Sequence, residues 1–240
     1  REAFLFSPLT RHTMLSFINE IDDPIVQQDI LDLNRRILRF REGTIDEERF
    51  RSLRLARGVY GQRQPGVQMI RIKVPMGLLS FDQFRTILDV CDEYSTGKYH
   101  LTTRQDIQIH HVKLEDSPEL WAKLERSQVT LREACGNTVR NVTASPMAGI
   151  DPDEPFNVLP WADALWKFFL RNPVCQEMGR KFKVAFSSSQ EDTALAVMHD
   201  LGVIPIRNDQ GEPGFKVLVA GGLGAQPAPA EVLHHWLPAN

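Results

Sequence analysis

The fold is decided by residues 68–91, which read QMIRIKVPMGLLSFDQFRTILDVC. Residues 68–74 alternate as a strand with one buried face does, and the Pro and Gly that follow predict a turn. Ser80 followed by Gln83 has the capping-box pattern of a helix N-terminus, ahead of apolar residues at helical spacing. The stretch therefore predicts a strand, a tight connection and an amphipathic helix.

The residues that follow continue this arrangement. Short strands are predicted near Tyr99–Leu101 and over Asp106–Lys113, and a helix is predicted from about Asp116 to Arg126. Strand, helix, strand, strand and helix in this order make up most of a ferredoxin-like α+β sandwich. We therefore expect a ferredoxin-like half-domain over residues 58–127.

The residues before the half-domain predict helices. Asp23-Pro24 opens a run from Ile25 to Arg39 in which apolar residues recur at near-helical spacing, and Thr44 begins a second run rich in Glu, Arg and Leu. We expect residues 1–57 to form a helical N-terminal extension.

The residues after the half-domain predict a mixed α/β domain over residues 128–240, truncated at its C-terminus. Residues 144–159 are rich in Pro, Gly, Asp and Asn, which is typical of a loop or linker. Beyond them the pattern predicts a helix at 160–171, strands at 181–187, 203–207 and 215–219, and a last short helix at 231–236. The expected fold class is therefore α+β, with a helical segment, a βαββα half-domain and a mixed α/β domain in that order.

The composition is that of a soluble globular chain. Hydrophobic residues make up 42% and charged residues 25% of the 240 residues, which excludes wholesale disorder and a collagen-like or coiled-coil rod. The 28 Lys and Arg residues against 31 Asp and Glu give a net charge of −3, whereas a nucleic-acid-binding domain is usually basic. The sequence shows neither a membrane-span pattern nor a signal-peptide pattern. We expect a cytoplasmic protein that binds neither nucleic acid nor membrane.

The cysteines point to a reducing compartment. Cys91, Cys135 and Cys175 are too few and too scattered for a disulfide framework, so we expect thiols. There is no C-x-x-C, so this chain alone is not expected to build a structural zinc site or an iron–sulfur cluster. Cys135 has no base nearby in the sequence and is expected to be a packing residue. Because the chain begins at Arg1, we expect a processed product or a piece of something longer.

Four predicted segments, three strands and a candidate strand or turn at 139–141, carry cations or hydrogen-bond donors opposite an apolar face, because side chains alternate along a strand. Solvated edge strands are one interpretation. The other is a pocket for a polyanion or a small oxyanion, because crowded cations repel one another unless an anion lies among them, and Arg presents it a fixed fork of donors. The polar faces hold Arg71 with Lys73, Lys181 with Lys183, Gln108 with His110, Thr102 and Arg104 on the Gln108 side, and Arg140 between Val139 and Asn141.

Metal and dinucleotide sites are less well supported. His110 and His111 are expected on opposite faces of their strand, and His234 and His235 about 100° apart on the last helix, so neither pair predicts a metal site. Gly221-Gly222 follows a strand but lacks the G-x-G-x-x-G order of a dinucleotide-binding loop.

Five motifs in a fixed order resemble a known family. The sequence reads GVYGQRQPGVQMIRIKVPMG at 58–77, LTTRQDIQIH at 101–110, CGNTVRNVTASPMAG at 135–149, RKFK at 180–183 and GFKVLVAGGLG at 214–224. From about residue 55 to residue 225, the chain resembles the N-terminal half of the siroheme-dependent sulfite and nitrite reductases.

The resemblance implies a cofactor and its site. Siroheme is an iron tetrapyrrole with eight carboxylates, and a [4Fe–4S] cluster beside it is held by cysteines of a second half that this sequence does not contain. By position, the basic residues around the substrate anion are matched by Arg71, Arg140, Lys181 and Lys183. The contacts to the macrocycle and its carboxylates are matched by Thr102, Thr103, Arg104, Gln108, His110 and Arg180.

The implied activity is the reduction of sulfite to sulfide by an assimilatory-type enzyme, with electrons from ferredoxin or a flavoprotein. Lys183 favours sulfite, since relatives specialised for nitrite often carry Asn at this position. The alternatives are a nitrite reductase that forms ammonia and a non-catalytic tetrapyrrole- or anion-binding module. An RNA-binding sheet is not favoured, because the central strands offer His110 and His111 in place of exposed aromatic residues for base stacking.

Several features depart from the family pattern. The cluster cysteines and the second copy of the half-domain are missing, so we expect a fragment or one of two polypeptides, inactive on its own. Asn137 stands where relatives often carry Asp, and Ala220 replaces a Gly of the glycine run.

Overall fold

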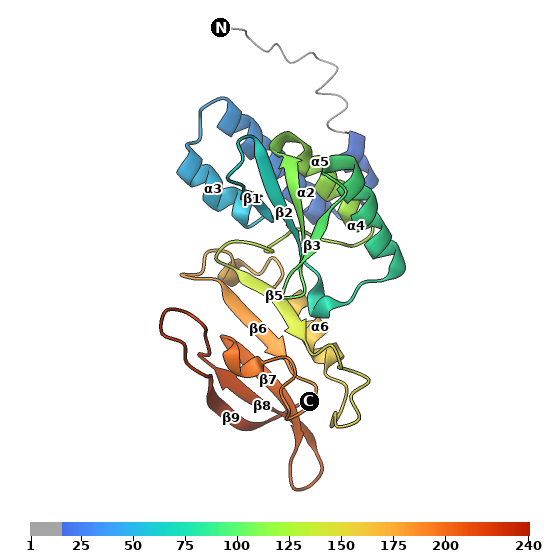
Figure 1. The fold of residues 1–240 in the computed structure, drawn as a ribbon, viewed down its shortest axis with the longest axis vertical. Helices are drawn as coiled ribbons and strands as arrows, with labels where there is room; N and C mark the ends of the chain where they lie inside the picture. Colours follow the sequence, from blue (N-terminus) through green and yellow to red (C-terminus); the bar gives the residue numbers. More distant parts are fainter. Residues whose placement is uncertain (1–15) are drawn as a thin grey trace. The chain divides into compact units, whose positions relative to one another are not determined.

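The computed structural model describes residues 16–240, and these form two compact units (Figure 1). Unit 1 contains the described residues up to Ile72, with Leu79–His100 and Ile107–Leu131, and unit 2 contains Lys73–Leu78, Leu101–Asp106 and Arg132–Asn240. The first part of the expected N-terminal extension, residues 1–15, lies outside the described residues. The domain boundaries at residues 57/58 and 127/128 stay predictions.

Unit 1 confirms the predicted order of strand, helix, strand, strand and helix. Its four-stranded sheet has the order β1-β2-β4-β3, and β2 pairs antiparallel with both β1 and β4. Its elements are η1 (Phe17–Glu20), α2 (Pro24–Arg41), α3 (Glu47–Leu55), β1 (Val59–Gly61), β2 (Val67–Ile72), α4 (Phe81–Tyr94), β3 (Tyr99–Leu101), β4 (Ile107–Lys113), η3 (Leu114–Asp116) and α5 (Ser117–Glu125). β1 lies in a Gly-rich stretch where the sequence predicts only the end of the helical part.

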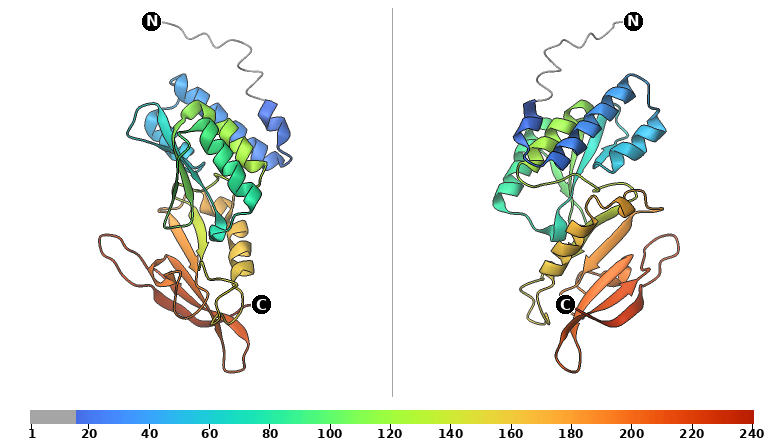
Figure 2. Two further views of the ribbon diagram at one scale, coloured as in Figure 1. Left: turned by 45° about the vertical axis from the view of Figure 1, so that its right-hand side comes forward. Right: turned by 180° about the vertical axis from the view of Figure 1, so that it is seen from behind.

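Local sequence explains the elements of unit 1. Ser80 and Gln83 form the predicted capping box at the start of α4, with each side chain accepting from the other residue's backbone N–H. α2 begins after Asp23, whose carboxylate accepts the N–H of Ile25 at 2.8 Å. Figure 2 shows α4 and α5 side by side against the sheet, and Trp121 of α5 is fully buried there.

Unit 2 is built on a mixed five-stranded sheet in the order β5-β6-β7-β8-β9. β5, β6 and β7 are parallel, whereas β8 and β9 continue the sheet antiparallel. The elements are η2 (Pro75–Gly77), β5 (Val139–Ala144), α6 (Leu159–Phe169), η4 (Pro173–Cys175), β6 (Phe182–Phe186), η5 (Ala196–Met198), β7 (Leu201–Arg207), β8 (Pro213–Val219) and β9 (Glu231–Pro238).

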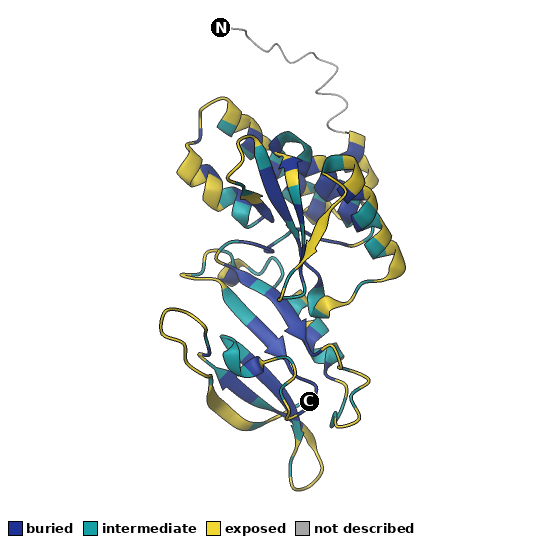
Figure 3. Ribbon diagram, viewed as in Figure 1, coloured by how far each residue is buried: buried dark blue, intermediate teal, exposed yellow. Residues whose placement is uncertain are grey.

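Two hydrophobic clusters fix the faces of this sheet. The larger cluster joins α6 to β5, β6, β7 and β8, and the smaller one lies under η5. Along β6, Phe182, Val184 and Phe186 belong to the larger cluster, and Ala185 belongs to the smaller one. This confirms the predicted alternation, which directs Lys183 away from the apolar side chains of its strand. Figure 3 shows the buried centre of the sheet and the exposed strand β9 at its edge.

The predicted last helix is wrong. Glu231–Pro238 forms strand β9, which pairs antiparallel with β8 through positions such as Phe215 with Leu237 and Val217 with His234. An isolated helix of this length is only marginally stable. The conformational free energy needed to form its first turn exceeds the stabilisation from the few hydrogen bonds that follow. The open edge of β8 instead offers backbone partners along the whole segment. His234 and His235 therefore lie on a strand.

The three cysteines, Cys91, Cys135 and Cys175, are buried thiols, as predicted, and none of them forms a disulfide within residues 16–240. Among residues 16–240, no helix is both long and apolar enough to cross a membrane.

Candidate functional site

A cavity of about 570 Å³ lies in unit 2 and is lined by three of the predicted site residues, Thr103, Arg104 and Lys183. Gln105 and His199, which sequence reasoning did not single out, are also part of its wall. A cavity of this volume suits a small molecule or cofactor. It is lined by stretches that are distant in sequence: the turn at 101–106, the end of β5, the start of β6, the segment leading into β7, and Leu223 after β8.

A tight turn presents Thr103 and Arg104 to the cavity. The N–H of Thr102 donates to Asp106 O at 2.9 Å, and the Thr102 hydroxyl accepts from the N–H groups of Arg104 at 3.3 Å and Asp106 at 3.0 Å. Gln105, with φ of 60°, continues the turn and donates from its amide to Ala144 O at 2.7 Å. Thr102 therefore stabilises the turn through hydrogen bonds of its backbone and its hydroxyl group.

Arg104 is a fixed cation with unused donors. Its Nη2 donates to Asn141 O at 2.5 Å and to Val184 O at 3.2 Å, whereas its buried Nε and Nη1 have no hydrogen-bond partner among residues 16–240. Burial lowers the pKa of Arg104 to about 10, an effect that Asp106 opposes and Arg140 reinforces. The guanidinium thus stays charged at neutral pH. A guanidinium has donors only, so an acceptor that reached these nitrogens, a carboxylate in particular, would satisfy them.

Lys183 enters the cavity from the start of β6. Its backbone N–H donates to Asp200 Oδ2 at 2.8 Å, and its Nζ lies 3.6 Å from the same oxygen. His199, the neighbour of Asp200, turns its Nδ1 to Leu195 O at 2.8 Å. Burial lowers the pKa of His199, and the charges of Arg104 and Lys183 act in the same direction. At neutral pH, the cavity wall therefore combines two cations with a neutral imidazole.

Arg140 comes from β5, next to an irregularity in the pairing of that strand with β6. Its Nη2 donates to Ala134 O at 2.5 Å, which fixes the half-buried guanidinium. The positive charge of Arg140 lowers the pKa of Arg104, so the two guanidinium groups are close enough to repel each other. Lys181 and Arg180 directly precede β6 and are exposed, and neither is among the residues that line the cavity.

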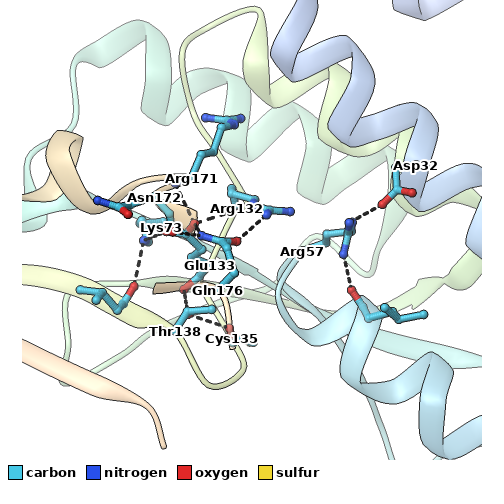
Figure 4. A network of polar contacts seen from close by, with 12 residues as sticks. Asp32, Arg57, Lys73, Arg132, Glu133, Cys135, Thr138, Arg171, Asn172 and Gln176 are labelled. Carbon is cyan, nitrogen blue, oxygen red and sulfur yellow. Dashed lines mark hydrogen bonds and ion pairs between the residues drawn. The ribbon is translucent and has the colours of Figure 1, made fainter. Parts of the chain in front are cut away.

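Lys73 requires a correction, because it does not present its charge beside Arg71. Only 4% of Lys73 is exposed, its Nζ lies 3.7 Å from the fully buried Glu133 carboxylate, and it donates to Val139 O at 3.4 Å (Figure 4). Glu133 also accepts from the Arg171 N–H at 2.8 Å and the Gln176 amide at 2.7 Å. Burial lowers the pKa of Lys73. The pair is a structural anchor of unit 2, and its charges cancel locally.

In unit 1, Arg71 and Gln108 lie opposite each other on β2 and β4. With its amide oxygen turned toward Arg71, Gln108 accepts from Nη2 at 2.6 Å and from Nε at 3.2 Å. Arg71 and Gln108 therefore share one face of the sheet, and the amide holds the guanidinium in one orientation.

His110, also on β4, belongs to a cluster of imidazoles. Its ring centroid lies 5.3 Å from that of His100 and 6.4 Å from that of His111. The backbone at His111 has φ of 64°, and the pairing of β4 with β2 shifts at this point. This bulge breaks the strict alternation of faces expected for the two adjacent histidines. Among the described residues, no group of three His, Cys, Asp or Glu side chains could hold a metal ion.

The structure thus brings together Thr103, Arg104 and Lys183, with Thr102 and Arg140 close by, in unit 2. It brings together Arg71 and Gln108 in unit 1. That both sets face one ligand stays a prediction. Sequence reasoning missed Glu133, His199 and Asp200. The last two precede a predicted strand at 203–207, and polar residues at the beginning of a buried strand were the available signal.

Comparison with known proteins covers most of the chain. A model of the nitrite/sulfite reductase ferredoxin-like half domain matches residues 60–127, and a model of the nitrite and sulphite reductase 4Fe-4S domain matches residues 135–240. The chain belongs to the nitrite and sulfite reductase family. This confirms the resemblance expected from the five motifs, and members of the family bind siroheme and a [4Fe–4S] cluster.

Curated relatives are divided between two activities. An assimilatory ferredoxin-dependent nitrite reductase of Haloferax mediterranei is 38% identical over 184 residues, which cover 70% of this chain and 31% of the relative. A sulfite reductase [ferredoxin] of Mycolicibacterium paratuberculosis is 29% identical, over 72% of this chain and 31% of the relative. The chain therefore spans about a third of the length of these relatives.

Solved structures agree with the α+β fold. The Mycobacterium tuberculosis NirA protein superposes with a TM-score of 0.75 at 26% identity, over 82% of this chain and 39% of that chain. Dissimilatory sulfite reductase I matches with a TM-score of 0.65 at 12% identity, over 100% of this chain and 78% of that chain, which supports the fold alone.

Proposed function

We propose that this chain is the N-terminal half of an assimilatory-type enzyme that reduces sulfite to sulfide, using siroheme and a [4Fe–4S] cluster. The observation that carries the proposal is the cavity of unit 2, which is lined by Arg104 and Lys183; two buried nitrogens of Arg104 have no partner within the part of the chain that the structure describes. Membership in the nitrite and sulfite reductase family supports the reaction class.

The donor set of the cavity fits a ligand that carries many carboxylates. The buried Nε and Nη1 of Arg104 are N–H donors on different edges of the guanidinium, and carboxylate oxygens accept charge-assisted hydrogen bonds from such donors. When bound, siroheme supplies the iron and ring that carry the redox chemistry, with electrons from the cluster. The residues proposed to hold it are Thr102, Thr103, Arg104, Gln108, His110 and Arg180. The cluster ligands are assigned to the remaining part of the enzyme.

Four cations are proposed to bind the substrate anion: Arg71, Arg140, Lys181 and Lys183. Arg71 is preoriented by Gln108 and Arg140 by Ala134 O, so neither guanidinium has to be ordered when the anion arrives. Fixed cations stabilise an oxyanion most where its oxygens gain negative charge in a dry pocket. The two lysines are proposed as general acids that deliver protons as oxygen leaves as water.

The electron donor is proposed to be ferredoxin or a flavoprotein. Several relatives are named as ferredoxin-dependent enzymes, among them a ferredoxin–nitrite reductase of Leptolyngbya laminosa and mycobacterial sulfite reductases. These names describe the relatives, and they favour ferredoxin as the first donor to assay.

The test is an absorption spectrum of the full-length parent protein together with sulfite and nitrite assays driven by reduced ferredoxin. The proposal expects siroheme absorption and a higher kcat/KM for sulfite than for nitrite. A preference for nitrite would make the enzyme a nitrite reductase, the second candidate, which the Haloferax relative at 38% identity favours. Bound siroheme without turnover of either anion would instead indicate a tetrapyrrole-binding module.

A further inference from the structure

Asp200 makes two contacts with one lysine. Its Oδ2 accepts the backbone N–H of Lys183 at 2.8 Å and lies 3.6 Å from the Lys183 ammonium. The two side chains are 32% and 27% exposed, so the pair is neither buried nor free in solvent. A single carboxylate oxygen thus accepts a hydrogen bond from the Lys183 backbone and forms a loose ion pair with the Lys183 ammonium.

The sheet explains this arrangement. β6 and β7 are parallel neighbours with Val184 opposite Leu201, so Lys183 and Asp200 face each other one residue before the paired region. Asp200 is itself held, because its carbonyl accepts the N–H of Ala220 at 3.1 Å. Gly221 packs directly behind, where a Cβ atom would lie 2.8 Å from His199 O. The carboxylate is therefore attached to a rigid part of unit 2.

The charge distribution gives Asp200 a defined role. The described residues that line the cavity include Arg104 and Lys183 but no carboxylate. Asp200 stands next to this lining, and its charge acts on Arg104 as well. We propose that Asp200 is a positioning residue: it holds the Lys183 side chain at the cavity wall and competes with an incoming anion for the ammonium.

The strength of the contact suits this role. A half-exposed ion pair contributes little, because solvent screens it, so an anion can replace the carboxylate without a large energetic cost. The competition with an anion depends on the proposed function, whereas the tether between Asp200 and Lys183 does not.

The test is lysine acetylation of the full-length holoenzyme, with the rate at each lysine followed by mass spectrometry. Asp200→Asn keeps an oxygen acceptor for the Lys183 N–H and removes the charge. An amine freed from a carboxylate reacts faster, and we expect Lys183 to be acetylated about two- to fivefold faster, in keeping with a half-exposed pair. Asp200→Glu should keep the slow rate. Asp200→Ser, also uncharged and oxygen-bearing, is the second variant if Asp200→Asn does not fold.

Asp163 and Lys167 provide the matched control. They form a 2.7 Å ion pair on α6 in the same unit, away from the cavity lining. Asp163→Asn should leave the Lys183 rate unchanged, and Asp200→Asn should leave the Lys167 rate unchanged. An unchanged Lys183 rate in both uncharged variants of Asp200 overturns the proposal.

Anion protection separates this proposal from the proposed function. Sulfite should protect Lys183 from acetylation, with half-protection at about two- to fivefold lower concentration in Asp200→Asn. If the native enzyme and Asp200→Asn needed the same sulfite concentration for half-protection, Asp200 would not compete with the anion. If neither sulfite nor nitrite protects Lys183 but Asp200→Asn still accelerates its acetylation, the tether stands and the proposed substrate site fails.

Discussion

Lys183 is the residue on which the proposed substrate preference depends. Its ammonium lines the cavity beside Arg104, and the family resemblance associates Asn at this position with nitrite. In the full-length enzyme, we expect Lys183→Asn to lower sulfite turnover by about 10²-fold, the range for a lost proton donor, and nitrite turnover by less. Steady-state assays with both anions measure this. The control is Lys167→Asn on α6, and equal losses on both anions would remove the preference.

His110 predicts a pH dependence of stability. Burial lowers its pKa from 6.5, and the neighbouring His100 and His111 act in the same direction. Below pH 6.5 the unfolded chain therefore binds a proton that the folded chain does not, so the free energy of unfolding falls as the pH falls. The slope is at most about 1.4 kcal/mol per pH unit, and smaller here because solvent screens the half-exposed ring.

Denaturant unfolding at pH 7.5 and pH 5.5 measures the contribution of His110 to the pH dependence of the free energy of unfolding. The native protein should lose more stability between the two values than His110→Gln, which has no imidazole to protonate. The difference in the free energy of unfolding between the native protein and His110→Gln at pH 7.5 serves as the reference. Parallel losses would show that the environment of His110 does not resist protonation.

Sequence reasoning at the residue scale succeeded where the information is local. Alternation along β6 assigned Lys183 and Phe182 to opposite faces correctly, because a regular strand has a fixed period of two. It failed for Lys73, whose partner Glu133 is sixty residues away in the chain. Only the folded backbone brings that pair together, and no local pattern distinguishes a lysine that faces an anion from one that is ion-paired.

At the scale of elements, the connection after β8 contains a strained residue. Ala220 has φ of 66°, a left-handed conformation that costs a residue with a Cβ about 1–2 kcal/mol. It follows β8 and donates to Asp200 O, so the conformation is imposed by the fold. Ala220→Gly should stabilise the protein by about 0.5–1 kcal/mol, after the greater chain entropy of glycine is subtracted.

Thermal or denaturant unfolding tests this prediction. Ala228→Gly is the matched control, because Ala228 lies in the same connection, has no positive φ and should lose stability on the same change. If Ala220→Gly destabilised the protein as much as Ala228→Gly does, the left-handed turn would not be under strain.

Capping and periodicity made most elements predictable. The Ser80–Gln83 box marked the start of α4 to the residue, and the Pro- and Gly-rich stretch correctly separated β5 from α6. β9 was missed because its sequence suits a short helix as well as a strand, and the choice depends on hydrogen bonds to β8. Elements decided by tertiary pairing are the ones that sequence patterns do not determine.

At the scale of the whole molecule, the chain covers about a third of the length of its curated relatives. We expect these 240 residues, expressed alone, to retain little siroheme, since the cluster ligands are proposed to lie in the remaining part of the enzyme. The absorption spectrum after purification, compared with that of the full-length protein, measures retention. Stoichiometric and tightly held siroheme in the short chain would contradict this.

The exposed strand β9 has a consequence for experiments on the 240-residue chain expressed alone. It ends the sheet of unit 2, and its side chains include the exposed Val232, Leu233 and Leu237. Within residues 16–240 its outer edge pairs with no further strand, and an apolar sheet edge of this kind is a template on which identical chains can add strand to strand. Concentrated stocks of the short chain should therefore self-associate, and a light-scattering series over concentration belongs beside every spectrum taken from it.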